Sequence, residues 1–99
     1  MGTLNIAIKA DEKDNVATIF SNGSINGSAV EVRDRKGKTD SMTVIGDVPY
    51  GHKIALWNLK KGDEIIKYGQ VIGIASREIK KGEYVHIHNL DALRGRGDL

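Results

Sequence analysis

The chain has 99 residues, carries a formal net charge of +2 and contains no cysteine. This length is that of one domain, too small to enclose the deep pocket of a large enzyme alone, and the small charge does not favour nucleic acid or an anionic membrane as a partner. Disulfides and thiolate chemistry are excluded. No apolar run reaches a signal-peptide core or the roughly 20 residues of a membrane span, so we expect a cytoplasmic protein.

Short apolar segments separated by turn residues predict an all-β domain. Hydrophobic residues make up 39% of the chain and aromatic residues only 5%, while glycine occurs 12 times. Such a core is typical of aliphatic side chains on short strands. In chain order, the expected strands lie within residues 4–10, 14–20, 28–34, 41–48, 53–59 and 69–79. We place Trp57, the only tryptophan, in the core.

An internal repeat occupies the second half. LKKGDEIIKYG begins at Leu59 and IKKGEYVHIHN begins at Ile79, which is a spacing of 20 residues. Two copies are too few for a solenoid. The repeat instead predicts two equivalent strands or hairpins of one small β domain, each entered through a Lys-Gly turn.

The second copy leads into GEYVHIHNL, which contains two of the three histidines. On a strand, His86 and His88 would project from the same face, about 6–7 Å apart at their Cα atoms, while Val85 and Ile87 would face the core. Two neighbouring imidazoles suit a divalent metal or acid–base chemistry near neutral pH. The alternative is that both histidines are solvated and idle.

Three further residues are candidates with ordinary alternatives. His52 follows Gly51 in a turn-like context, and the alternative is an ordinary turn histidine. Lys67 and Tyr68 end an apolar segment, where the lysine can be solvated and the tyrosine can pack at the rim with its hydroxyl in water.

Four motifs together carry a family resemblance. PYGHKIAL, KKGDEIIKYGQVIGIA, IKKGEYVHIHNL and the closing RGRGDL resemble the small domain of the altronate dehydratase family, which belongs to the SAF-type, β-clip group. The match is closest over residues 46–93 and looser over the first 45. It implies one SAF-like β domain over residues 1–93, with residues 94–99 as a flexible tail.

Two positions depart from the family pattern. Val71 stands where proline is usual, which changes backbone rigidity. Tyr84 stands where the first of three alternating histidines is usual, which questions any role that needs all three imidazoles.

The resemblance implies the small subunit of a metal-dependent sugar-acid dehydratase of the altronate or galactarate type, inactive alone and completed by a large subunit. The metal would be Fe²⁺ or Mn²⁺, held mainly by the large subunit, with His86 and His88 as ligands from this chain. Catalytic roles would fall to His52, His86 and His88. Substrate-binding roles would fall to Lys67, Tyr68, Asn89 and Arg94.

Other functions stay open. The chain would alternatively be a SAF-type carbohydrate-binding or interaction module without catalysis, the small subunit of a sulfolactate sulfo-lyase, or an oligomerisation domain with idle histidines. The sequence selects neither the substrate nor the oligomeric state, because exposed strand edges of a small β domain can pair with a second copy when the partner is absent.

Overall fold

The computed structural model describes residues 5–20 and 26–92, and these residues form an all-β domain without helices. The part of the chain described therefore has no helix that could cross a membrane. The nine strands are β1 (Ile6–Ile8), β2 (Val16–Ile19), β3 (Ala29–Arg33), β4 (Thr39–Thr43), β5 (Lys53–Ala55), β6 (Glu64–Lys67), β7 (Gln70–Ala75), β8 (Tyr84–Val85) and β9 (Leu90–Ala92).

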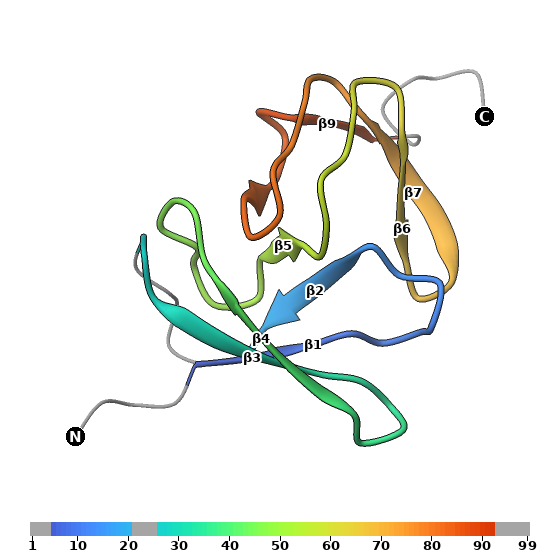
Figure 1. Ribbon diagram of the computed structural model, residues 1–99. Helices are drawn as coiled ribbons and strands as arrows, with labels where there is room; N and C mark the ends of the chain where they lie inside the picture. The colour runs from blue at the N-terminus through green and yellow to red at the C-terminus, as the bar shows by residue number, and fades with distance from the viewer. Residues whose placement is uncertain (1–4, 21–25, 93–99) are drawn as a thin grey trace.

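Two curled sheets make up the domain (Figure 1). The larger has the order β4-β3-β1-β2-β5-β8 and the smaller has the order β6-β7-β9. Strands β1 and β3 pair in parallel, and the other neighbours pair antiparallel. The all-β prediction is confirmed.

Each sheet face that meets the interior has its own core. One core lies within the larger sheet, and the second lies between the sheets. Strands β2 and β5 contribute to both, because successive side chains of a strand point to opposite faces. Ile54 of β5 is buried in the first core, and Ala55 in the second.

The 20-residue repeat forms a pseudo-symmetric pair of turns. Leu59 and Ile79 are buried and exchange both main-chain hydrogen bonds, with N···O distances of 2.7 and 2.9 Å. Each lysine turn also bonds to the strand that precedes the other copy, since Gly62 donates to the carbonyl of Ala75 in β7 and Gly82 donates to that of Ala55 in β5. The two copies are therefore joined directly by the main-chain hydrogen bonds between Leu59 and Ile79.

The strand predicted over residues 53–59 ends earlier, at Ala55. The Ala55 main chain bonds to Gly82 and Glu83, after which the chain bends so that Leu59 can meet its partner. The bend turns Trp57 outward with 47% of its surface exposed, so the prediction that Trp57 belongs to the core is wrong.

A buried polar pair joins the two sheets. Asp14 accepts a hydrogen bond from the Gly69 main chain at 2.9 Å, and Asn15 donates to the Glu64 carbonyl and accepts from the Ile66 main chain, both at 2.8 Å. Both side chains are buried. Because buried polar groups need partners, these bonds fix the β6–β7 hairpin, which carries the IKYG motif.

Candidate functional site

Four aromatic rings converge where β5 and β8 meet. Tyr84 lies opposite Ile54 across the β5–β8 pair, which brings its hydroxyl 2.8 Å from Nδ1 of His52. The Tyr84 ring stacks on the His86 ring, with centroids 5.7 Å apart, and lies 5.4 Å from the His88 ring. The centroids of His52 and His86 are 4.8 Å apart. All three histidines thus meet at Tyr84, and we call these four side chains the histidine cluster.

The backbone at His86 and His88 is a turn rather than the predicted strand. Strand β8 ends at Val85, and the Asn89 main chain donates to the His86 carbonyl at 3.0 Å, which closes a four-residue turn. Ile87 occupies the turn tip with 78% exposure, so the prediction that it faces the core is wrong. The two imidazoles meet through the intervening ring of Tyr84 and not as neighbours along a strand.

Asn89 holds this turn together. Its side chain is fully buried, accepts a hydrogen bond from the His86 main chain at 2.9 Å and donates to the Tyr84 carbonyl at 2.8 Å. The Arg77 guanidinium adds a bond to the His88 carbonyl at 2.8 Å. The structure therefore gives Asn89 a supporting position behind the histidines, with its amide engaged by main-chain groups instead of facing solvent.

Lys53 adds a positive charge that the sequence analysis assigned no role. It lies in β5 next to His52 and is half-buried, and its ammonium group makes no hydrogen bond or ion pair with a described residue. Burial lowers its pKa, and the nearby charge of Lys67 lowers it further. The available signal was the GHK motif, in which this lysine directly follows a candidate histidine.

His86 experiences the same positive surroundings. Desolvation lowers its pKa below the ordinary value, and the charges of His52, Lys53 and His88 act in the same direction. A histidine with a lowered pKa is a neutral imidazole at pH 7, able to accept a proton. The histidine cluster therefore offers a proton acceptor, His86, beside the ammonium group of Lys53, which can attract an anion.

Tyr68 occupies a strained backbone position at the tip of the β6–β7 hairpin. Its φ angle is +54°, the only positive φ among the described residues other than glycine. The residue is 66% exposed, and Nζ of Lys67 lies 5.2 Å from the ring centroid. Positive φ costs energy for a bulky side chain, and such strain concentrates at functional sites. Arg94, the fourth predicted substrate-binding residue, lies outside the described residues.

The histidine cluster does not complete a metal site by itself. Among residues 5–20 and 26–92, no group of three or more histidine, cysteine or acidic side chains is placed to hold a metal ion. Nδ1 of His52 is already occupied by the Tyr84 hydroxyl. The assignment of His86 and His88 as metal ligands stays a prediction, and it requires further ligands from another chain or segment.

Comparison with known proteins places the chain in a family. The model of the altronate/galactarate dehydratase SAF domain matches residues 5–93. Altronate dehydratase of Bacillus subtilis (strain 168) is 51% identical over 49 residues, which are 50% of this chain and 10% of that protein. Galactarate dehydratase (L-threo-forming) of Escherichia coli (strain K12) is 37% identical over 78 residues, 79% of this chain and 14% of that protein.

A second kind of relative is much shorter. The alpha subunit of (2R)-sulfolactate sulfo-lyase from Paracoccus pantotrophus is 43% identical over 53 residues, which are 54% of this chain and 79% of that subunit. The chain therefore spans a small part of the dehydratases and most of the sulfo-lyase subunit. With nearly its whole length matched, the chain belongs to the family of altronate/galactarate dehydratase SAF domains.

Proposed function

We propose that this chain supplies acid–base and anion-holding side chains to the active site of a sugar-acid dehydratase, as its small subunit. The observation that carries the proposal is the convergence of His52, His86 and His88 on Tyr84 beside a half-buried lysine. Histidines packed only for stability would not need this unpaired positive charge beside them.

Eliminating water from a hydroxy acid requires a base for the proton next to the carboxylate and an acid for the departing hydroxyl. His86 fits the base, because its lowered pKa keeps it neutral at pH 7. His52 is oriented by the Tyr84 hydroxyl, so this pair can hold and return a proton at a fixed place.

The substrate carboxylate needs cationic partners, and Lys53 and Lys67 fit that role. The charge of Lys67 lowers the pKa of Lys53, although the two lysines come from different sheets. A carboxylate between two ammonium groups would gain charge-assisted hydrogen bonds and relieve the repulsion between them. Tyr68, beside Lys67, would then line the same side of the substrate.

The rest of the active site would come from a large subunit. The histidine turn lies at the surface, with His88 exposed and Ile87 at its tip. We propose that the partner covers Ile87, closes the site and provides most ligands of the divalent metal, Fe²⁺ or Mn²⁺. A bound metal would supply charge stabilisation for the departing oxygen.

A sulfo-lyase subunit is the second candidate, favoured by the 79% coverage of the Paracoccus pantotrophus alpha subunit. Both candidates place the site at the interface with a second chain and use the same histidines and lysines. They differ in the substrate and in the group that leaves.

The test is capture of the tagged chain from its native lysate, followed by assay of the eluate. We expect a large partner to co-purify and the complex, but not the isolated chain, to dehydrate altronate or galactarate when Fe²⁺ or Mn²⁺ is present. Release of sulfite from sulfolactate would select the second candidate. Altronate binding without turnover, lost in His86→Ala, would contradict catalysis and support a binding module.

A further inference from the structure

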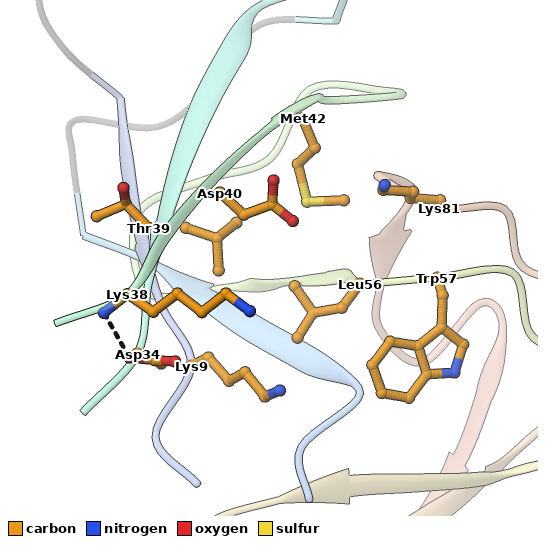
Figure 2. A pocket seen from close by; sticks show the side chains of 10 residues that line it. Lys9, Asp34, Lys38, Thr39, Asp40, Met42, Leu56, Trp57 and Lys81 are labelled. Atoms are coloured by element: carbon orange, nitrogen blue, oxygen red, sulfur yellow. Dashed lines mark hydrogen bonds between the residues drawn. The ribbon is translucent and has the colours of Figure 1, made fainter. Parts of the chain in front are cut away.

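A separate cavity lies beside strands β3 and β4 of the larger sheet (Figure 2). It encloses about 180 Å³ between the β3–β4 hairpin and the bend that follows β5. None of the histidine cluster lines it. His52 and Leu56 bracket β5, about 13 Å apart at the rise of an extended chain, so the cavity and the cluster occupy opposite ends of this strand.

The floor and one wall of the cavity are apolar. Val32 is buried, Met42 and Leu56 are half-buried, and all three belong to or pack against the first core. Trp57 forms the wall with 47% of its surface exposed. The exposed indole of Trp57, next to aliphatic side chains, offers a flat apolar surface to a small apolar group or to the apolar face of a ring.

The rim is cationic. Lys9, Lys38 and Lys81 line the cavity, and Figure 2 shows Lys9 and Lys38 extending toward Leu56. None of the three ammonium groups makes an ion pair or side-chain hydrogen bond with the residues that the structure describes. Nζ of Lys9 lies 5.9 Å from the Trp57 ring centroid, so an anion paired with Lys9 would lie beside the indole.

Two aspartates, Asp34 and Asp40, also line the cavity, so its three lysines and two carboxylates leave a net charge of +1. Oδ1 of Asp34 accepts main-chain hydrogen bonds from Lys36 and Lys38, both at 2.9 Å, which uses it to shape the hairpin turn. Oδ1 of Asp40 accepts a hydrogen bond from the Ser41 main chain. The remaining carboxylate oxygens can accept hydrogen bonds from hydroxyl groups of a ligand.

We propose that this cavity binds a small organic anion, namely a carboxylate carried on a ring or compact carbon body the size of a monosaccharide. The volume supports this size, because an engineered protein cavity of about 150 Å³ holds a benzene molecule. The carboxylate pairs with Lys9 and Lys38, the carbon face contacts Trp57 and Leu56, and hydroxyl groups reach Asp40. This site does not depend on the proposed dehydratase function.

Trp57 provides a direct probe, since the chain contains one tryptophan and its fluorescence and indole N–H resonance report on this cavity alone. The isolated chain is titrated with D-glucuronate, which joins a ring to a carboxylate, and in parallel with D-glucose and with acetate. We expect saturable glucuronate binding with a Kd on the order of 1 mM, from the usual affinity per ligand atom. Glucose and acetate should each bind at least about ten-fold more weakly.

A matched pair of lysines on one turn separates specific binding from general attraction. Lys38→Gln removes a charge at the cavity, and Lys36→Gln removes the same charge two residues away, where Lys36 is exposed and pairs with Glu12. Lys38→Gln should raise the glucuronate Kd about five- to ten-fold. Lys36→Gln should leave it unchanged, and amide spectra of both variants verify the fold.

Three results would overturn the proposal. The first is no saturable response of Trp57 to glucuronate at 50-fold the expected Kd, on the order of 50 mM. The second is an equal loss in both lysine variants, which would show unspecific charge attraction. The third is a response of the indole resonance to the co-purifying large subunit but to none of the small molecules, which would make the cavity a partner contact.

Discussion

Replacing Tyr68 with asparagine should stabilise the isolated domain. Tyr68 and Gly69 are the two central residues of the β6–β7 hairpin turn, with φ of +54° and +74°. Two positive φ angles define a type I′ turn, for which Asn-Gly is the preferred pair. A non-glycine residue in this region costs about 1–2 kcal/mol, and asparagine reduces that cost by hydrogen bonding locally.

The loss of the ring offsets part of this gain. Tyr68 is 66% exposed, so little burial is lost, and the contact of Lys67 with the face of the ring is worth about 0.5–1 kcal/mol. The net expectation for Tyr68→Asn is a gain of about 0.5–1 kcal/mol, which corresponds to a rise in Tm of roughly 2–8 °C for a domain of this size.

Tyr68→Ala is the control, because alanine keeps a Cβ at the positive φ and also loses the ring. We expect Tyr68→Ala to lower the free energy of unfolding by about 0.5–1 kcal/mol. Thermal unfolding followed by circular dichroism measures both variants. If the ring contacts substrate or partner, both should reduce kcat/KM of the reconstituted enzyme about ten-fold or more, although their stabilities change in opposite directions.

Equal destabilisation by both substitutions would show that the backbone at Tyr68 is not strained and would refute the reasoning. Full activity of both variants would refute only the claim that the Tyr68 ring contacts substrate or partner. A Tyr68→Asn chain that is more stable and less active is the outcome that agrees with strain retained for function.

Three further predictions follow from the turns and the histidine cluster. Gly62→Ala should lower the free energy of unfolding by about 1–2 kcal/mol, because of its φ of +96° alone. Gly82→Ala should lower it by about 3 kcal/mol or more, because an added Cβ would also lie 2.0 Å from the Thr43 carbonyl oxygen. Urea unfolding compares the two variants, and equal costs would contradict the close packing at Gly82. Asn89→Ala should cost about 2–4 kcal/mol in the same assay, since two main-chain groups lose their buried partner, and a change below 1 kcal/mol would show that they do not depend on it. The pKa of His86 is lowered in the folded state, so protonation of His86 favours the unfolded chain. The domain should therefore lose stability as the pH falls from the unfolded value of about 6.5 through the folded-state pKa of His86. An NMR titration that places the His86 pKa above 6.5 would reverse the sign.

The sequence allowed the fold class to be predicted, but not the local geometry around the histidines. Short apolar segments separated by turn residues indicated short strands, and the GHK and HIHN motifs contain the three histidines that the structure brings together. The turn at His86 was missed because it depends on the Asn89 side chain, which accepts a hydrogen bond from the His86 main chain and donates one to the Tyr84 carbonyl. In the sequence alone, YVHIHN has the two-residue alternation that is typical of a β-strand.

Two other features depend on tertiary contacts. In β1 the fully buried residue is Ala7, whose side chain joins the first core, while Ile6 and Ile8 point to the opposite face and are half-buried. Trp57 is exposed because the repeat bends the chain after Ala55. No local pattern encodes either effect, since each depends on segments distant in sequence.

The most direct test of the account is the activity of the reconstituted complex with His52→Ala and His86→Ala in this chain, separately and together. Loss of a general acid or base lowers kcat about 10²- to 10⁴-fold. Because both residues serve the same proton-transfer site, the double variant should be little worse than the more damaging single variant. Lys61→Ala, an exposed turn residue, is the matched control and should retain full activity. Partner binding measured in parallel verifies assembly, and an assembled double variant with wild-type kcat would contradict the claim that this chain contributes to catalysis.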